Sequence, residues 1–446
     1  MTRLTSELRR RAIWPVTLLA TVLVACAPAA APTSAPAKPT EAAAKAAASP
    51  AAVASPGAAA SPAASPAAAA SPAAAPAAAQ PATGPAIKVG SVLSTSGPPA
   101  YLGDKMKKGV ELAIEEVNNA GGINGRRLEP IFYDPAGDSA AGVQQTRRLL
   151  EQDRVDVIVG GGSASGIALA MVPLAEEAGV LFMSTEGARQ ITEPVDQRKL
   201  VFKATLNDTE VINRTLAFWK KKNITTIGFL PDTSGFGQSA DEVMKEAAPK
   251  AGIRAVVETF DPGVQDMTPQ LTRIASQNPG AVLAWTATPA GVVFLKNAEQ
   301  LGLNQRALIQ HGFGFVDDRF MRQAGTAANG SLLSSQKVPV VDQLPDADPA
   351  KRRIAQFSQA YRTKFNEDPN IYAGQTYDGI YLVAEALKKA NSTKGTDVAA
   401  ELEKITAFNG ATGIFNFGPN RHNGLAEKDV VIIKWDGERF VLEDYE

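Results

Sequence analysis

The run of glycine and serine at residues 160–166 carries the residue types best suited to holding a small molecule. It follows an apolar stretch, residues 155–159, which we expect to be a buried strand, and it opens a helical segment. Backbone N–H groups at the start of a helix have no acceptor within the helix, and with serine hydroxyls beside them they form a site for a negative charge. Hydrogen bonds to charged groups contribute about 1.5–3 kcal/mol each, so a few of them could fix a carboxylate without an arginine.

The same run fails to match two enzyme motifs. A dinucleotide-binding GxGxxG fingerprint needs a third glycine where Ser165 stands. A nucleophile elbow needs glycines two residues before and after the serine, and neither Ser163 nor Ser165 has both. Of the two histidines that could serve as bases, His422 falls in a stretch at 418–424 that we expect to be an exposed turn. We therefore predict that the protein is not an enzyme and uses no cofactor and no metal.

Short β-rich runs alternate with helical segments from residue 87 onward. The first expected strands are residues 87–93, 128–133, 155–159 and 180–183, and a second set is residues 224–230, 253–260 and 281–285. Such alternation implies parallel sheets with helices on both faces, and two sets in succession suggest two lobes. Late strands at 331–335, 413–417 and 429–435 could return the chain between them. A ligand would then lie in the cleft, beyond the carboxyl ends of the strands.

The N-terminus carries the features of an export signal. Arginines at positions 9–11 precede an apolar run at residues 12–25, which is too short to span a bilayer as a mature helix. The run ends in the residues Leu-Val-Ala-Cys, which resemble the lipobox of bacterial lipoproteins, where the cysteine thiol is diacylated. We predict a signal peptide at residues 1–25 and lipidation of Cys26, the only cysteine in the sequence. The alternative is an ordinary signal peptide followed by a chance cysteine.

Residues 26–86 are rich in alanine, proline and serine. Frequent prolines interrupt a helix, and the segment has too few large apolar side chains to offset the entropy of ordering. We predict a disordered tether that spans on the order of 45 Å on average, or alternatively drifted sequence with no required length. Across the whole chain, 45 basic residues balance 46 acidic ones, and without a basic stripe carrying interleaved aromatics we expect no nucleic-acid partner.

A longer pattern begins at residues 96–103, which read SGPPAYLG. It continues through a helix with Met106, Val110, Ile114 and Val117 on one face, and through the turn NNAGGINGR at residues 118–126. A strand ending in Tyr133 and Asp134 follows, and Asp138 opens the next helix. The pattern closely resembles the branched-chain amino acid binding proteins of ABC transporters, the type I periplasmic-binding family, and the similarity covers essentially all of the chain after the tether.

The resemblance implies an α/β fold of two Rossmann-like lobes with parallel sheets, joined by three crossovers. The first lobe would comprise residues 87–205 and 336–425, and the second would comprise residues 206–335 and 426–446. The lobes would close around one solute. Membrane permease and ATPase subunits would be separate proteins, which agrees with the lack of a GxxxxGK[ST] phosphate loop in this sequence.

The resemblance also implies polar ligand contacts after two strands of the first lobe. Relatives bind the carboxylate of their ligand at the turn that matches residues 160–166, where Ser165 best fits the hydroxyl ligand. Ser163 is a second candidate, although it could instead cap the helix. Thr185 and Gly187 match contacts just past the next strand, and the alternative there is a plain strand-to-loop exit.

Four aromatic residues are candidates for the cleft walls. Tyr101 stands where the first loop of the family meets the cleft, Phe236 lies between two glycines in an expected loop, and Tyr377 begins a helix in the closing segment. Trp285 ends an expected strand. Flat rings beside glycines can cover an apolar solute. Each of the four could equally be a core residue.

The chain departs from the family in its second lobe. Amino acid binders place a carboxylate there, after the strand that here corresponds to residues 307–310, to pair with the ammonium group of the ligand. Here residues 311–315 read HGFGF, with no acid before Asp317. A buried ammonium without a counter-charge is strongly unfavourable. Either Asp317 or Glu186 therefore substitutes, or the ligand is not an α-amino acid, and the phenylalanines favour an apolar or aromatic acid.

The leading hypothesis is a monomeric, lipid-anchored receptor outside the cytoplasm, at the cell surface or in the periplasm. It would capture an amino acid or a related small carboxylate or amide for an ABC permease and touch the membrane through its lipid alone. The alternative is the ligand-sensing domain of a signalling system, which would usually continue into a membrane span, whereas this sequence stops at Glu446. An adhesion role is a third possibility, and an open cleft without ligand affinity would favour it.

Overall fold

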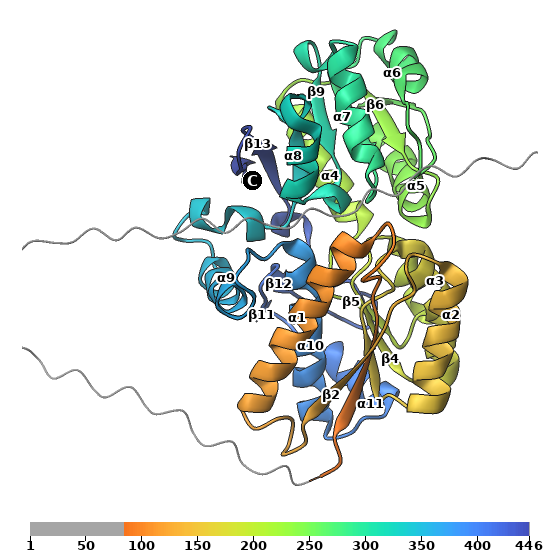
Figure 1. Ribbon diagram of the computed structural model, residues 1–446, viewed down its shortest axis with the longest axis vertical. Helices are drawn as coiled ribbons and strands as arrows, with labels where there is room; N and C mark the ends of the chain where they lie inside the picture. The colour runs from red at the N-terminus through yellow and green to blue at the C-terminus, as the bar shows by residue number, and fades with distance from the viewer. Residues whose placement is uncertain (1–83, 446) are drawn as a thin grey trace, which may run out of the picture. The chain divides into compact units, whose positions relative to one another are not determined.

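The computed structural model describes residues 84–445 (Figure 1). The expected signal peptide, Cys26 and the tether up to residue 83 lie outside the described residues. In the part of the chain that is described, the strands form two large sheets and one two-stranded sheet. None of the helices in this part combines the length and the apolar character that a membrane span needs.

Lobe 1 is built on a five-stranded parallel sheet in the order β2-β1-β3-β4-β5. Its strands are β1 (Ile87–Val92), β2 (Leu128–Tyr133), β3 (Val157–Val159), β4 (Leu181–Ser184) and β5 (Val201–Lys203). Its helices are α1 (Ala100–Asn119), α2 (Ser139–Arg148), α3 (Ser165–Ala178), α9 (Lys351–Phe365), α10 (Ile371–Ala390) and α11 (Gly395–Leu402). Every residue of β3, β4 and β5 is buried, which is why the expected strands β3 and β4 read as mostly apolar runs.

Lobe 2 is built on a seven-stranded mixed sheet in the order β14-β13-β10-β9-β8-β6-β7. Its strands are β6 (Thr226–Pro231), β7 (Arg254–Val257), β8 (Ala281–Trp285), β9 (Leu308–His311), β10 (Leu332–Ser335), β13 (Val431–Trp435) and β14 (Phe440–Asp444). Its helices are α4 (Asp208–Lys221), α5 (Gly235–Lys250), α6 (Thr268–Ala275), α7 (Ala290–Gln300) and α8 (Asp318–Ala324). The last two strands run antiparallel, β13 to β10 and β14 to β13.

The chain passes between the two sheets three times: after β5, after β10 and before β13. In Figure 1, α4 to α8 gather around the sheet of lobe 2, whereas α1, α2, α3, α10 and α11 gather around the sheet of lobe 1. The strands up to residue 203 belong to the first sheet, and those of residues 226–335 and 431–444 belong to the second. The exact lobe boundaries given above remain a prediction.

Helices α1 and α10 pack closely against each other. A Cβ at Gly109 of α1 would lie 2.2 Å from the carbonyl oxygen of Ala373 and 2.4 Å from Oγ1 of Thr376, so only glycine fits there. The Thr376 hydroxyl donates to the Met106 carbonyl oxygen at 2.7 Å, which ties the two backbones together. The predicted apolar face of α1 is confirmed, because all four of its members are buried: Met106, Val110, Ile114 and Val117.

In the two large sheets, strands β5 and β14 are not among those expected from the sequence. Strand β5 has three residues, one of them the fully buried Lys203, so it lacks an apolar run. Strand β14 continues from β13 through a turn at Gly437, whose φ is 108°. The stretch at 413–417 does not pass between the lobes, because β12 (Ile414–Phe415) pairs back onto β11 (Phe408–Asn409).

The expectation of an exposed turn at 418–424 is wrong for His422. This side chain is 1% exposed, and its ring stacks on that of Phe202 with centroids 3.8 Å apart. The His422 carbonyl accepts from the amide of Lys203 at 2.9 Å, and a bridge joins Lys203 to Asn423. Residues 422–424 are therefore buried because they pair with the free edge of β5, whereas residues 419–421 are exposed as expected.

Candidate functional site

Residues 160–166, here called the amide turn, join β3 to α3. Gly160, Gly162 and Ser163 have positive φ angles of 121°, 74° and 66°, a conformation that glycine adopts without strain. A Cβ at Gly161 would lie 2.6 Å from Cγ of Glu186, so glycine here lets that side chain lie across the turn. The glycines therefore allow both the tight turn and the close approach of the Glu186 side chain.

The amide turn keeps several N–H groups available to a ligand. The amide of Ser163 donates to Oε1 of Glu186 at 3.0 Å. Within residues 84–445, the amides of Ala164, Ser165 and Gly166 have no hydrogen-bond acceptor, and Ala164 precedes α3 without a side-chain cap. Three donors at the start of a helix favour an acceptor or a negative charge.

The two candidate serines have hydrogen bonds of their own. The Ser163 hydroxyl accepts from the amide of Ser94 at 3.0 Å, and the Ser165 hydroxyl accepts from the amide of Ala188 at 3.2 Å. Neither serine hydroxyl caps α3, so the alternative that Ser163 caps this helix is wrong. The Ser163 hydroxyl donates its proton to Sδ of Met106 at 3.6 Å, whereas the Ser165 hydroxyl keeps a proton that can be donated to a ligand.

Thr185 and Gly187 follow β4 directly. The Thr185 hydroxyl is buried and has no partner among the described residues, which is costly for a polar group unless a ligand or water satisfies it. A Cβ at Gly187 would lie 2.6 Å from Cζ of Phe313 and 2.7 Å from Cε2 of Phe236. Glycine at this position therefore allows two aromatic rings from lobe 2 to approach the loop after β4.

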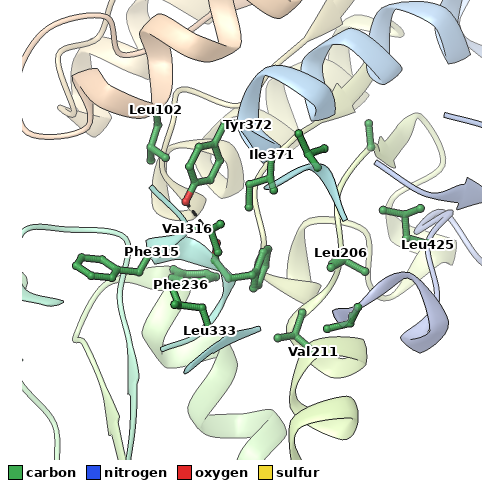
Figure 2. Packing of buried hydrophobic residues seen from close by; sticks show 14 of the residues in the cluster. Leu102, Leu206, Val211, Phe236, Phe315, Val316, Leu333, Ile371, Tyr372 and Leu425 are labelled. Atoms are coloured by element: carbon green, nitrogen blue, oxygen red, sulfur yellow. Dashed lines mark hydrogen bonds between the residues drawn. The ribbon is translucent and has the colours of Figure 1, made fainter. Parts of the chain in front are cut away.

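The aromatic wall comes from lobe 2. The ring centroids of Phe236 and Phe313 lie 5.5 Å apart, and Trp285 packs behind them at 5.4 and 5.8 Å. Figure 2 shows Tyr372 and Leu102 of lobe 1 facing Phe236 from the opposite side. Apolar surfaces therefore approach from both lobes.

These groups enclose a cavity of about 310 Å³ between the lobes. Lobe 1 contributes the start of α1 (Pro98, Pro99, Leu102, Met106), the amide turn with Ser163, Ser165 and Gly166, the loop Thr185, Glu186 and Gly187, and Tyr372 and Gln375 of α10. Lobe 2 contributes Asp232, Ser234, Gly235, Phe236, Ala287, Thr288, Phe313 and Gly314. The cavity lies at the carboxyl ends of the strands, the position expected for an open α/β sheet. Its size and its mixed lining suit a small molecule.

Two carboxyl groups border the cavity, one from each lobe. Burial raises the pKa of Glu186 to about 8, against the opposing effects of the Ser163 amide and the Lys203 ammonium. Burial also raises the pKa of Asp232, although Ser234 and Thr286 donate to it. The other proposed substitute for the missing acid, Asp317, lies outside the cavity lining and pairs with Arg319 at 2.8 Å.

Comparison with known proteins agrees with this architecture. Residues 86–439 match the family model described as periplasmic binding protein. The chain belongs to the periplasmic binding protein family. A leucine-, isoleucine-, valine-, threonine- and alanine-binding protein of Pseudomonas aeruginosa is 27% identical to it over 355 residues, covering 78% of this chain and 90% of the relative.

Solved structures confirm the type I periplasmic-binding fold. An extracellular ligand-binding receptor from Rhodopseudomonas palustris HaA2 aligns with a TM-score of 0.74 at 24% identity, covering 80% of this chain and 99% of that one. The branched-chain amino acid transporter substrate binding protein LivJ from Streptococcus pneumoniae, solved with isoleucine, aligns with a TM-score of 0.67 at 25% identity. That alignment covers 80% of this chain and 97% of LivJ.

In this periplasmic binding protein Tyr101 does not line the cavity, but it bridges the lobes beside it. Its hydroxyl donates to the Ala287 carbonyl oxygen of lobe 2 at 2.6 Å. Its ring meets that of Phe320 at 4.6 Å between centroids. A second bridge runs from the Tyr372 hydroxyl to the Phe313 carbonyl oxygen at 3.3 Å. The structure therefore describes the lobes in contact around the cavity.

The structure also places Tyr377 and Trp285 away from the cavity lining. Tyr377 lies in the core of lobe 1, where its hydroxyl donates to Glu116 at 2.6 Å, because the middle of α10 packs against α1. Trp285 is fully buried behind Phe236, and its indole N–H has no acceptor among the described residues. The other five candidates border the cavity together: Ser163, Ser165, Thr185, Gly187 and Phe236.

Several lining residues were missed from the sequence as contacts. Tyr372 and Gln375 belong to the first turns of α10, whose start at the cap residue Asn370 is the available signal. Asp232 directly follows β6, so the rule that ligands lie beyond the carboxyl ends of strands could have found it. In residues 84–445, no group of three histidine, aspartate or glutamate side chains converges in a way that could hold a metal ion.

Proposed function

We propose that this periplasmic binding protein is the extracytoplasmic solute-binding component of an ABC importer, and that it captures an amino acid or a related small molecule in the cavity between its lobes. The observation that carries the proposal is the cavity itself. It is bounded by both lobes, and three backbone amides and the Thr185 hydroxyl without protein partners border it. The Pseudomonas relative is named for binding amino acids, and LivJ was solved with one.

The arrangement supports capture by closure of the lobes. A solute that contacts both the amide turn of lobe 1 and Phe236 of lobe 2 stabilises the closed state over the open one, because only that state offers both surfaces. The lobe-bridging hydroxyls of Tyr101 and Tyr372 also form their bonds in the closed state. A permease that recognises the closed state would then receive loaded protein only.

Thermal unfolding with a panel of amino acids, amines, amides and carboxylates tests the proposal. At about a hundredfold excess over Kd, a true solute stabilises the folded chain by about 2.7 kcal/mol, which raises Tm by several degrees. Thr185→Val should weaken that solute roughly tenfold, since it removes a hydroxyl that no protein group uses.

Thr192→Val is the matched control. Thr192 is also buried with an unpartnered hydroxyl, but it does not border the cavity. The control should therefore bind like the unaltered protein. If no compound raises Tm, or if both variants weaken binding equally, the cavity is not the capture site.

A further inference from the structure

Glu186 brings an incompletely satisfied carboxyl group to the cavity. The residue is 6% exposed, and its Oε1 accepts from the Ser163 amide at 3.0 Å. No described residue donates to its other oxygen, Oε2. Among residues 84–445, no lysine, arginine or histidine borders the cavity. A buried carboxylate thus faces the solute space without a counter-ion there.

The nearest buried cation does not fill this role. The Lys203 ammonium donates to the carbonyl oxygens of Gly187 and Ala188 at 3.0 and 2.7 Å, behind the loop that carries Glu186. Asp232, the carboxyl group on the opposite lobe, already accepts from Thr286 at 2.7 Å and from the amide of Ser234 at 3.0 Å. Of the two acids, Glu186 is therefore the one with an oxygen left for a ligand.

Glu186 also changes what the amide turn can hold. Its carboxyl group occupies the Ser163 amide, one of the donors that would otherwise meet a negative head group. When Glu186 is ionised, a solute carboxylate at the remaining amides of Ala164, Ser165 and Gly166 would lie next to a like charge, and like charges in a poorly hydrated cavity repel strongly. A positive group between the two removes the repulsion and satisfies Oε2.

We infer that the solute carries a protonated amine that pairs with Glu186, so that a carboxylic acid without an amine is rejected. The inference rests on the proposed function and names the chemistry that this site selects. In amino acids the carboxylate would meet the free amides of the turn, and in simple amines a neutral part would do so. Glu186 of lobe 1 thus takes the counter-charge role that the sequence of lobe 2 lacks at residues 311–315.

Two matched sets of compounds test this with the full chain. One set is leucine, 3-methylbutylamine and 4-methylpentanoate, and the other is phenylalanine, phenethylamine and 3-phenylpropanoate. Titration calorimetry should give the acid of each set at least tenfold weaker binding than its amine-bearing partners. The ratio of the Kd of the amino acid to the Kd of the simple amine then tells whether the solute also has a carboxylate.

The variant Glu186→Gln keeps the shape of the side chain and removes its charge. We expect amine-bearing compounds to lose roughly tenfold to hundredfold in affinity. Glu177→Gln, which makes the same change at an exposed position on α3, should leave affinity unchanged. Circular dichroism melts without solute show whether Glu186→Gln is folded, and a second variant, Glu186→Asp, should retain part of the amine preference.

The pH dependence of affinity gives a second measurement. Lys203 of β5, Asp232 after β6 and Tyr372 of α10 are the titratable groups around Glu186. Because the pKa of Glu186 is raised to about 8, an amine that pairs with the ionised form must displace a proton below that pH. Amine affinity should fall by up to about tenfold per pH unit below pH 8 in the unaltered protein and stay flat in Glu186→Gln.

The outcomes separate this inference from the function on which it rests. Acids that bind as tightly as amines, or amine binding that survives in Glu186→Gln, would overturn the inference. The proposed function as a solute-binding protein would still stand. If no compound in the wider thermal panel binds, both the inference about Glu186 and the proposed function are wrong.

Discussion

Gly187 shows how one missing side chain shapes the site. The rings of Phe236 and Phe313 approach the place of its Cβ to 2.7 and 2.6 Å, so the wall from lobe 2 closes onto bare backbone. Next to it, Lys203 donates to the Gly187 carbonyl oxygen and holds the same peptide from behind. The loop after β4 is therefore fixed between a buried ammonium and two aromatic rings.

Replacement of Gly187 by alanine should push these rings aside. We expect Gly187→Ala to cost about 1–3 kcal/mol of stability through overpacking and to weaken solute binding, as measured by urea unfolding and by calorimetry. Gly166→Ala is the control, since a Cβ there meets nothing within 4 Å. Its stability should change by less than about 1 kcal/mol. Equal losses of stability in both variants would contradict the steric argument.

The polar side of the site and one wall residue, Phe236, could be predicted from the sequence, but the other wall residues could not. Thr185 directly follows β4, and Ser163 and Ser165 lie in the turn after β3. Strand ends meet at one edge of a parallel sheet, which agrees with the positions that the resemblance to the family implied for these residues. The wall residues depend on how two lobes meet, which no local pattern encodes. Tyr372 and Tyr377 lie on one helix, yet only Tyr372 borders the cavity, because α1 covers the middle of α10.

Helix α1 links the two lobes through its first turn. The Tyr101 hydroxyl donates to the Ala287 carbonyl oxygen of lobe 2, and the Arg319 guanidinium at the start of α8 donates to the Tyr101 carbonyl oxygen at 3.2 Å. The remainder of α1 packs on α10 within lobe 1. The same element thus belongs to the core of one lobe and to the contact between both.

Tyr101→Phe removes the bridging hydrogen bond and keeps the ring. Since the bond joins the lobes only when they are closed, its loss should raise Kd about fivefold, equivalent to about 1 kcal/mol. Tyr377→Phe deletes a hydroxyl that bonds to Glu116 inside lobe 1. It should lower Tm without changing Kd by more than about twofold. Calorimetry and thermal melts on both variants check this, and a Kd that rises equally in both would refute a closure role for Tyr101.

At the scale of the molecule, hydrophobic packing and a few hydrogen bonds hold the lobes together. One hydrophobic cluster runs from Leu102 and Met106 of lobe 1 to Phe236 and Phe313 of lobe 2. The sequence offers no disulfide, because Cys26 is its only cysteine. The fold class and the two-sheet plan follow from strand and helix periodicity, whereas the short β5 and the edge pairing of His422 arise from tertiary contacts that periodicity does not report.

We predict that the protein is attached to a membrane through lipidation of Cys26. Acyl chains on the cysteine would hold the protein at a membrane, since each buried methylene adds about 0.8 kcal/mol. The unaltered protein should therefore sediment with membranes, whereas Cys26→Ser should be released to the soluble fraction and lose incorporated radiolabelled palmitate. Ser34→Ala, in the same tether, is the control and should stay membrane-bound. Sedimentation of Cys26→Ser with membranes would exclude the lipid as the anchor.

The contact at Gly109 limits how this receptor can change its selectivity. With 2.2 Å between the place of a Cβ and the Ala373 carbonyl oxygen, α1 and α10 cannot slide past each other. The cavity residues on these helices, which include Met106 and Tyr372, should therefore move together as one rigid unit. Adaptation to a solute of another size would therefore proceed by substitution of cavity side chains, while the packing of α1 on α10 stays fixed. The three segments that connect the lobes would supply the movement of the lobes.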